Sequence, residues 1–488
     1  MLQPCRRVYI ALADSKLTAV ELGAAPSDRY RPLLEPEVWN EFDQAMTRAA
    51  ARLRGRVVWN VNSTARGGGV AELLNALIPY DRGAGIDARW VVVQGPPEFF
   101  AVTKKLHTLL HGVDPDGQGL TADEGKTYEE SEAANAAALL GIARPGDIVL
   151  LHDPQTVGMA PALADAGCTV VWRCHVGVDE PNDAGRAAWS FLRGYLSSAA
   201  AVVFSRRKYV WDGLDESRVR IVAPSIDAFT VKNQELDGPT VIGLLRDGGV
   251  LQGTNGDATF LRSDGTRGRI TRRVSGLPEG GLAPDTQLIV QVSRWDRLKD
   301  PTGVVDGFAA HVSGSTAAHL VIAGPSATSV SDDPEQPEIL QELRARRESL
   351  PASIRDRVHL AQLPMEDEEE NAALVNALQR RADVVVQKSL AEGFGLTVAE
   401  AMWKSRPLVA SRVGGIEDQI EDGRSGVLID DPRDLASLGR AVVTVLQDET
   451  MARELGAAAR RRIGRHFLAP RHLMQQAELI TDVLDRPD

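Results

Sequence analysis

Asp383-Val-Val-Val-Gln-Lys-Ser-Leu-Ala-Glu-Gly-Phe-Gly-Leu-Thr-Val-Ala-Glu400 joins the pattern that decides the fold to the most informative site motif of the chain. A short β-rich run predicts a buried strand, and a Gly-containing turn then leads into a helix. A helix N-terminus exposes unpaired N–H groups and a partial positive charge, so it can hold a phosphate. Glu392 and Glu400 flank the turn and can accept hydrogen bonds from sugar hydroxyls. This one segment could therefore bind both parts of a sugar nucleotide.

The same alternation of β-rich runs and helical segments extends along most of the chain, in two series. The first series comprises residues 56–62, 89–94, 147–152, 169–173, 201–204 and 219–222. The second series comprises residues 288–292, 319–323, 358–361, 383–387, 407–410 and 426–429. Such runs predict parallel sheets with crossover helices. We therefore expect an α/β chain with two doubly wound, Rossmann-like domains facing a cleft, and ligands beyond the carboxyl ends of the strands.

The two series divide the chain into predicted domains. We expect an N-terminal domain over residues 1–235 and a C-terminal domain over residues 282–464. A C-terminal helix over residues 465–488 is expected to pack back on the N-terminal domain. Residues 1–55 mix short apolar and helix-like stretches and show no clear motif.

Residues 236–281 lie between the two series and are rich in Gly, Asp, Arg and Thr. They are either a flexible linker or a small hairpin insertion. In the second case, residues 259–262 would pair with residues 269–272 across an Asp-Gly turn.

Composition and charge exclude several classes of protein. The 488 residues are 43% hydrophobic and 25% charged, as in an ordinary globular protein of two or three domains. A formal net charge of −12 argues against a broad nucleic-acid surface. No apolar run approaches the ~20 residues of a membrane span, and no signal-like apolar region is present, so a cytoplasmic location is expected. Cys5, Cys168 and Cys174 fit neither a disulfide framework nor a metal cluster.

Two further motifs could contact a phosphorylated ligand. Gly67-Gly-Gly69 lies between a predicted strand and a predicted helix, where glycines let the backbone approach a ligand. It is neither a dinucleotide fingerprint nor a Walker loop, and a tight turn is the alternative reading. Arg294 and Lys299 follow the first strand of the second series and can converge on a diphosphate. A solvated charged loop is the alternative there.

The turn after residue 391 allows a more detailed prediction. Backbone N–H groups of Gly395, Leu396 and Thr397 could hold the distal phosphate, with Glu392 facing the sugar and Glu400 facing the ribose hydroxyls. Glycosidase carboxylates stand about 5–9 Å apart across one bond, which suits this pair poorly because a turn and a helix separate them. An acidic helix N-terminus without a ligand is the structural alternative.

Histidines close two strands of the first series. His175 follows the strand at residues 169–173 and can donate a hydrogen bond to a sugar hydroxyl, and His152-Asp153 ends another strand in the same way. A structural role is the alternative for each. His107 and His111 have metal-ligand spacing, but no Glu base lies between them, and a packed helix pair is favoured. No metal is assigned.

Taken together, these motifs resemble the retaining glycosyltransferases of family 4, which have the GT-B fold. The Glu392–Glu400 signature and the pair Arg294 and Lys299 carry that match. Within the family the chain looks most like the trehalose-forming glycosyltransferring synthases and the retaining trehalose phosphorylases. Four strings carry this narrower resemblance: Val58–Glu72, Gly95–Lys104, His152–Gln155 and Trp172–His175. The resemblance covers residues 56–230 and 285–480.

The resemblance implies roles for individual residues. Arg294 and Lys299 would neutralise the leaving diphosphate, and Glu392 would bind the transferred glucose. The implied catalytic set is His175, Arg294, Lys299 and Glu392, with His175 near the anomeric centre of the donor sugar. The implied donor-binding set is Gly67, Gly68, Gly69, Gly395, Leu396, Thr397 and Glu400. Asn62 and Asp153 are candidates on the acceptor side.

The implied activity is retaining glucosyl transfer from a nucleoside-diphosphate glucose to glucose, giving α,α-trehalose. The alternatives are a trehalose phosphorylase that uses glucose 1-phosphate, a family 4 glycosyltransferase with another acceptor, and a non-catalytic regulator that binds sugar nucleotides. The intact basic pair argues against the regulator. No covalently bound cofactor is expected, and a divalent ion is not indicated. The expected partners are sugars and nucleotide sugars, not nucleic acid or membrane, and a homodimer is left open.

The chain departs from the family pattern in two places. Residues 236–281 are longer than the domain linker of the trehalose-forming group. After Ser225-Ile-Asp227 the sequence continues as Ala-Phe-Thr, where that group tends to have Pro-Leu-Ser. Neither departure touches the donor motifs, but both bear on acceptor choice.

Overall fold

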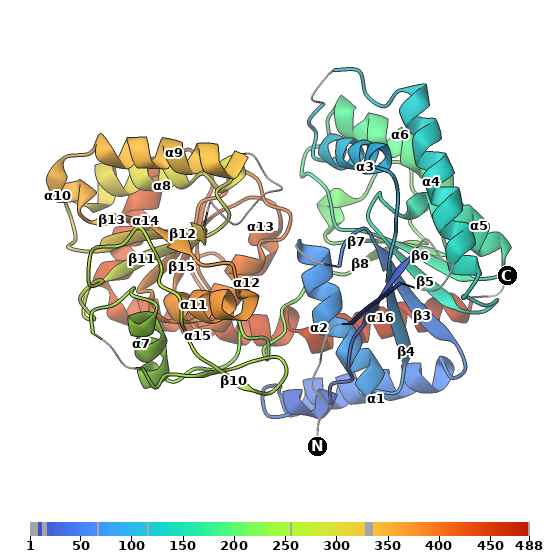
Figure 1. Ribbon diagram of the computed structural model, residues 1–488, viewed down its shortest axis with the longest axis horizontal. Coiled ribbons are helices and arrows are strands. Elements are labelled where there is room, and N and C mark those ends of the chain that lie inside the picture. The colour runs from blue at the N-terminus through green and yellow to red at the C-terminus, as the bar shows by residue number, and fades with distance from the viewer. Residues whose placement is uncertain are drawn as a thin grey trace. The chain divides into compact units, whose positions relative to one another are not determined.

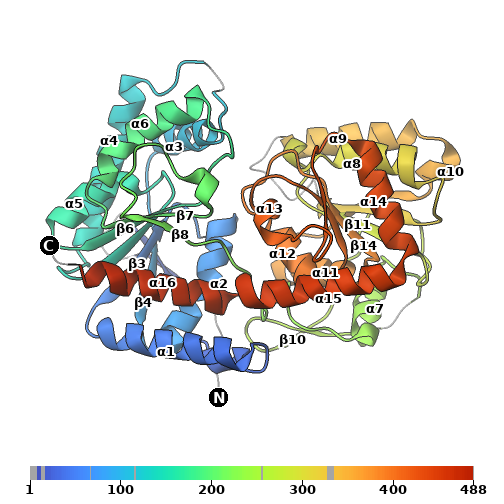
Figure 2. The ribbon, with the colours of Figure 1, turned by 180° about the vertical axis from the view of Figure 1, so that it is seen from behind.

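The computed structural model describes residues 8–11, 17–65, 68–114, 117–253, 256–326 and 335–486, with the backbone alone for residues 8–11. The chain forms two compact units, Met1–Ser225 with Leu468–Asp488, and Ile226–Phe467. Each unit has a sheet between two layers of helices (Figure 1 and Figure 2). No helix within the described residues is long and apolar enough to cross a membrane.

The first unit is built on a sheet with the order β1-β2-β4-β3-β5-β6-β7-β8. Its strands are β1 (Val8–Ala11), β2 (Thr18–Glu21), β3 (Val57–Asn62), β4 (Asp87–Val92), β5 (Ile148–His152), β6 (Thr169–Cys174), β7 (Ala201–Phe204) and β8 (Val219–Ile221). The strands from β3 to β8 run parallel, and each overlaps one predicted run of the first series. They could be predicted because a parallel strand buried on both faces is a continuous apolar run. The antiparallel strands β1 and β2 were not predicted.

Helices cover both faces of this sheet (Figure 1 and Figure 2). One face carries α1 (Pro36–Arg52), α2 (Gly69–Gly83) and α16 (Ala469–Leu484). The other carries α3 (Pro97–Leu110), α4 (Ala122–Leu140), α5 (Ala160–Asp165) and α6 (Asp183–Leu196). Three 3-10 turns complete the unit, η1 (Ser27–Tyr30), η2 (Val157–Met159) and η3 (Arg207–Tyr209). The last helix of the chain belongs here because it packs along α1, where Arg52 and Asp485 form an ion pair.

The second unit has an all-parallel sheet with the order β13-β12-β11-β14-β15-β16. Its strands are β11 (Leu288–Val292), β12 (His319–Pro325), β13 (Val358–Leu363), β14 (Val384–Gln387), β15 (Leu408–Ser411) and β16 (Val427–Ile429). The predicted runs of the second series match them to within two residues at each end. Strand order reverses between β11 and β14, so the loops after these two strands border the topological switch point, where open α/β sheets bind ligands.

Two helical layers cover this second sheet (Figure 1). One layer contains α8 (Pro301–Gly307), the π-helical η5 (Phe308–Val312), α9 (Glu335–Glu348), α10 (Ala352–Arg355) and α14 (Leu435–Gln447). The other contains α7 (Gly238–Asp247), α11 (Glu368–Arg381), α12 (Leu396–Trp403) and α15 (Glu449–His466). The short helices η4 (Arg297–Lys299) and α13 (Gly415–Gln419) follow β11 and β15.

The first unit ends at Ser225 and not at the predicted residue 235, because the next ten residues are fastened to the second unit. The N–H of Ile226 donates to the carbonyl of Phe467. The Asn376 side chain donates to the carbonyl of Val231 at 3.0 Å. The Trp403 indole donates to the carbonyl of Asn233 at 3.2 Å. These hydrogen bonds join residues that are far apart in the sequence, so the domain boundary that they set could not be predicted from a local pattern.

Residues 236–281 group with the second unit and are not a free linker. They begin with α7, which packs on α11, and continue into a short ribbon, β9 (Phe260–Leu261) with β10 (Arg267–Gly268). The predicted hairpin would have used residues 269–272 as its second strand, but Arg267 lies opposite Leu261.

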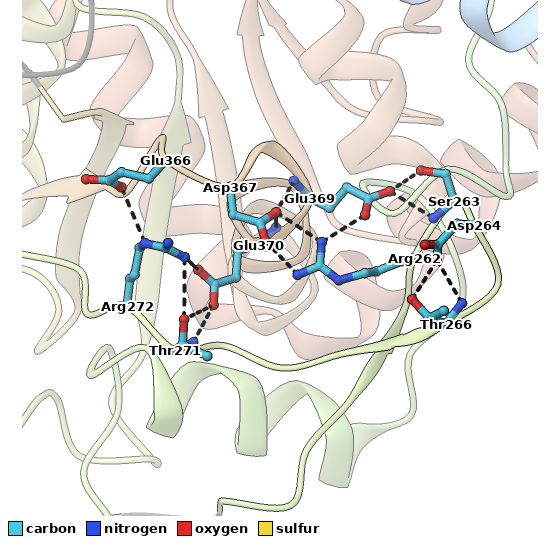
Figure 3. Close-up of polar contacts among 10 residues, drawn as sticks. All are labelled: Arg262, Ser263, Asp264, Thr266, Thr271, Arg272, Glu366, Asp367, Glu369 and Glu370. Carbon is cyan, nitrogen blue, oxygen red and sulfur yellow. Dashed lines mark hydrogen bonds and ion pairs between the residues drawn. The ribbon is translucent and has the colours of Figure 1, made fainter. Parts of the chain in front are cut away.

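Side-chain anchors explain why the ribbon is shorter than predicted (Figure 3). Arg262 contacts Asp367 at 2.6 Å and Glu369 at 2.9 Å. Thr271 and Arg272 both bind Glu370, so the chain there follows the first turn of α11 instead of β9. We call residues 260–272 the ribbon segment.

Candidate functional site

The carboxyl ends of β11 and β14 bring together several of the predicted donor-binding residues. Lys299 ends η4, and its ammonium forms an ion pair with Glu392 in the loop after β14. The N–H of Leu390 donates to the carbonyl of Leu298 at 2.7 Å, which ties the two loops through their backbones. We call residues 293–300 and 388–395 together the charged end.

Gly395 shapes the turn from the charged end into α12. Its φ of 86° lies in the left-handed region, which glycine adopts without strain. The turn is also held from outside, because the Gln419 side chain donates to the carbonyl of Phe394 at 2.5 Å. Helix α12 starts at Leu396, so the N–H groups of Leu396 and Thr397 belong to its first turn, where they lack intrahelical acceptors. The sequence prediction placed these groups on a phosphate.

Glu400 lies one turn further along α12 and is buried, with a relative exposure of 1%. Its carboxylate is 3.5 Å from the ammonium of Lys232, which compensates the buried charge. Arg294 differs, because its side chain is 61% exposed and pairs with Asp296 at 3.1 Å in its own loop. The structure therefore places Lys299, Glu392 and Gly395 in one cluster and places Arg294 at the solvent side of the same loop.

The carboxyl ends of β5 and β6 carry a second polar cluster, made of His152, Asp153 and His175, which we call the neutral end. The Nδ1 atom of His152 lies 3.0 Å from the Nε2 atom of His175. The Nε2 atom of His152 lies 3.3 Å from the side-chain oxygen of Asn60. With the Asn60 amide in this orientation, His152 carries its proton on Nε2 and accepts from His175, which leaves the Nδ1 atom of His175 as an acceptor.

Burial and a neighbouring cation keep the two histidines of this cluster uncharged. Burial and, to a smaller extent, the charge of Arg173 together lower the pKa of His152 to about 3. The pKa of His175 is held well below its ordinary value by burial, by Arg173 and by His152. Both imidazoles are therefore neutral near pH 7, and can exchange hydrogen bonds with uncharged hydroxyls.

Asp153 supports the loop that carries the neutral end. Its φ of 63° is left-handed, which is strained for a residue with a side chain. Its carboxylate accepts the backbone N–H of His175 at 2.7 Å. Burial raises the pKa of Asp153 to about 7, against the lowering effect of that hydrogen bond and of Arg173. Asp153 therefore joins the ends of β5 and β6.

Arg173 links the neutral end to the last helix of the chain. It is buried, and its guanidinium lies 2.8 Å from the ring of His472 on α16. It also donates to the carbonyl of Val222 at 2.9 Å. Burial lowers the pKa of Arg173 to about 10, so it remains the cation that keeps the nearby histidines neutral.

The remaining predicted residues have different outcomes. Asn62 is buried and fully used inside the unit, because it accepts from Trp90 at 2.7 Å and donates to the carbonyl of Thr64 at 2.7 Å. These contacts make Asn62 a support of the loop after β3, and its place beside the acceptor stays a prediction. Gly68, with φ 77°, caps α2, and Gly69 is its first residue. Gly67 lies outside the described residues.

The histidine pair on α3 and the cysteines add no site. His107 and His111 pack edge to face, with ring centroids 4.7 Å apart. Among the described residues, no group of three or more His, Cys, Asp or Glu side chains could hold a metal ion. Cys168 and Cys174 are buried free thiols, and Cys5 lies outside the described residues.

Sequence reasoning missed several residues that build both ends. Lys388 directly follows a predicted strand, so its position at a strand end was a usable signal. Asp300 follows Lys299 and offered no signal of its own. Asn60 and Arg173 lie inside predicted strands, where polar residues could have been noted as exceptions. No sequence signal indicated the contact of His472 with Arg173, because 299 residues separate the two.

Comparisons with known proteins show similarity to two families over most of the chain. Residues 60–211 match the family described as "Trehalose synthase, N-terminal domain", and residues 278–462 match "Glycosyl transferases group 1". A trehalose synthase of Rubrobacter xylanophilus is 34% identical over 93% of this chain and 96% of its own length. A trehalose phosphorylase of Pleurotus sajor-caju is 27% identical over 89% of this chain and 58% of its own. The solved α,α-trehalose-phosphate synthase (UDP-forming) of Burkholderia vietnamiensis superposes with a TM-score of 0.63 at 14% identity, covering 88% of this chain and 99% of that one.

Proposed function

Because this chain belongs to the trehalose synthase family of retaining group 1 glycosyltransferases, with the GT-B fold, we propose that it makes α,α-trehalose from a nucleoside-diphosphate glucose and glucose. The observation that carries the proposal is the charged end at the switch point of the second sheet. There a lysine of the loop after β11 pairs with a carboxylate of the loop after β14, which leads into a helix N-terminus. These are the groups that a diphosphate joined to a sugar requires.

The donor would be held by the second unit. We propose that Lys299 and Arg294 neutralise the diphosphate and that the N–H groups of Leu396 and Thr397 bind its distal phosphate. Glu392, already paired with Lys299, would accept hydrogen bonds from the transferred glucose. Glu400, whose carboxylate lies 3.5 Å from the ammonium of Lys232, would accept from the ribose.

The sugars would be oriented by neutral groups of the first unit. We propose that the Nδ1 atom of His175 accepts a hydrogen bond from a hydroxyl of the donor glucose. His152 would fix the ring of His175, and Asp153 would fix its backbone, since both contacts are present in the structure. Neutral imidazoles suit this task because they add no charge beside the anomeric carbon.

The proposed reaction needs no protein nucleophile. The bond from the anomeric carbon to the diphosphate oxygen breaks, and a bond to the anomeric oxygen of the acceptor glucose forms on the same face. The acceptor proton passes to a phosphate oxygen of the departing nucleoside diphosphate. The protein contributes by stabilising the charge that develops on the diphosphate and by orienting two sugars.

A phosphorylase is the second candidate, favoured by the resemblance to the Pleurotus enzyme. Phosphate and glucose 1-phosphate would then occupy the same charged end. This chain matches 58% of the length of that relative, whereas it matches 96% of the Rubrobacter synthase. The difference in shared length makes the synthase the first choice.

The test is a donor panel. Purified protein is incubated with glucose and, in separate reactions, UDP-glucose, ADP-glucose, GDP-glucose or glucose 1-phosphate, with and without Mg²⁺, and trehalose is measured by NMR. We expect α,α-trehalose and one equivalent of nucleoside diphosphate from at least one nucleotide sugar. Trehalose from glucose 1-phosphate alone would replace the synthase with the phosphorylase. No disaccharide from any donor would contradict both.

A further inference from the structure

One lysine of the charged end is buried and has no role in the reaction proposed above. Lys388 directly follows β14, and its relative exposure is 2%. Its ammonium forms an ion pair with Asp300, the residue after Lys299. A lysine this deeply buried is rare, since removing its charge from water costs free energy that only a well-placed partner offsets.

The surrounding backbone is shaped to admit this pair. A Cβ atom at Gly303 would lie 2.2 Å from a carboxylate oxygen of Asp300 and 2.7 Å from the ammonium of Lys388. Glycine at this position therefore leaves the space that the two charges occupy. The room made for them indicates that the pair is a built feature of the fold and not a chance surface contact.

Asp300 is itself held in an unusual conformation. Its φ of 44° and ψ of 52° are left-handed, which is strained for a residue with a side chain. One carboxylate oxygen accepts the N–H of Gly303 at 3.0 Å and caps α8, while the other takes the ammonium of Lys388. The two contacts together hold the turn that ends the Lys299 loop.

The pair is one of several contacts that hold the loop after β11. The side chain of Gln291, within β11, donates to the carbonyl of Lys299 at 2.9 Å. Contacts from the loop after β14 include the N–H of Leu390, which donates to the carbonyl of Leu298 at 2.7 Å. They also include the buried ammonium of Lys388, which pairs with Asp300 directly after Lys299 in the chain. The loop positions on both sides of the switch point therefore depend on this pair.

We propose that Lys388 is a positioning residue for donor binding, which acts through Asp300 and does not touch the substrate. This inference rests on the proposed function of the charged end. By fixing Asp300, Lys388 sets where the Lys299 ammonium stands relative to Glu392 and the N-terminus of α12. Displacement by about 1 Å of a group that orients a reacting substrate can cost roughly 100-fold in rate.

The decisive variant is the double substitution Lys388→Met with Asp300→Asn. It removes both charges at once, so no uncompensated ion stays buried, and the amide oxygen of the new side chain can still accept the N–H of Gly303. We expect the melting temperature to stay within a few degrees of that of the unaltered protein. We expect kcat/KM for the nucleotide sugar to fall by about 100-fold while the KM for glucose is unchanged.

The single variant Asp300→Asn and a matched control complete the experiment. Asp300→Asn leaves the lysine unpaired, and we expect a similar loss for the donor together with a lower melting temperature. Arg262→Met removes the cation of a different cluster in the same unit, the ion pairs of the ribbon segment with Asp367 and Glu369 (Figure 3). We expect this variant to lower stability without changing donor kinetics.

The outcomes separate the inference from the function on which it rests. An active unaltered protein, with donor kinetics unchanged in the folded double variant, overturns the role of Lys388 and leaves the function intact. An equal loss of activity in Arg262→Met also overturns it, because general destabilisation would then explain the effect. An unaltered protein that makes no trehalose from any donor overturns the function itself.

Discussion

Each of the two sheets of this chain carries a polar cluster at the carboxyl ends of its strands. One cluster consists of ion pairs, and the other is built around uncharged histidines. At the charged end of the second unit, Lys299 and Glu392 meet as ions, and a second ion pair lies behind them. At the neutral end of the first unit, burial and Arg173 hold His152 and His175 in their uncharged forms. Both clusters stand at the carboxyl ends of parallel strands, where ligands of such sheets bind.

This difference indicates a division of labour. A diphosphate carries charge that cations and helix N-termini must neutralise as the bond to the sugar breaks. Sugar hydroxyls carry none, and they are oriented best by neutral donors and acceptors. Under the proposed function, the charged end would stabilise the diphosphate and the neutral end would orient sugar hydroxyls.

The largest expected effect comes from removing the cation of the charged end. We predict that Lys299→Ala lowers kcat by about 100- to 1000-fold, because the developing charge on the diphosphate loses its nearest ammonium. Steady-state assays with saturating nucleotide sugar measure this, and circular dichroism checks that the fold survives. Near-normal turnover in a folded variant would refute the phosphate role of Lys299.

A smaller loss is expected at the neutral end. We predict that His175→Ala lowers kcat/KM by about 10-fold, the value of one hydrogen bond to a sugar hydroxyl. His107→Ala on α3 serves as the control, since its ring packs on His111. The same loss in both variants would show that His175 matters for stability alone.

Salt should distinguish the two ends more finely. Raising ionic strength from about 0.05 M to 0.5 M shortens the screening length severalfold, so the KM for the nucleotide sugar should rise a few-fold. The KM for glucose should stay within about twofold, because neutral groups bind it. An equal rise in the KM for the nucleotide sugar and the KM for glucose would contradict the proposed difference between the charged end and the neutral end.

The smallest effect concerns the pH dependence of stability. Burial raises the pKa of Asp153 from 3.8 to about 7, so the folded chain keeps this proton more tightly than the unfolded chain does. Its contribution to stability is therefore greatest below about pH 4 and is lost as pH rises to about 7. Asp153→Asn should flatten this part of the curve of melting temperature against pH. Parallel curves for the two proteins would contradict the assignment.

The parallel strands and the charged loops were predictable because their signals are local. Each parallel strand is a continuous apolar run, and Lys299 and Glu392 lie in the loops that follow such runs. Contacts between distant residues could not be predicted, because they depend on strand order. Lys388 and Asp300 are 88 residues apart, and they meet because β14 lies beside β11.

The contacts of Asn62 also depend on strand order. Strand β4 brings the Trp90 indole to the side-chain oxygen of Asn62, and no local pattern in the sequence predicts this contact. The antiparallel edge formed by β1 and β2 escaped prediction because residues 1–55 carry no comparable pattern.

The most direct test of this division of labour is a calorimetric titration of UDP, ADP and GDP into the unaltered protein, Lys299→Ala and His175→Ala. The account predicts that at least one diphosphate binds the unaltered protein. It predicts that the same diphosphate binds His175→Ala equally well and binds Lys299→Ala at least about 10-fold more weakly, since a charged hydrogen bond is lost. Equal affinity for all three proteins, or weaker binding to His175→Ala alone, would contradict it.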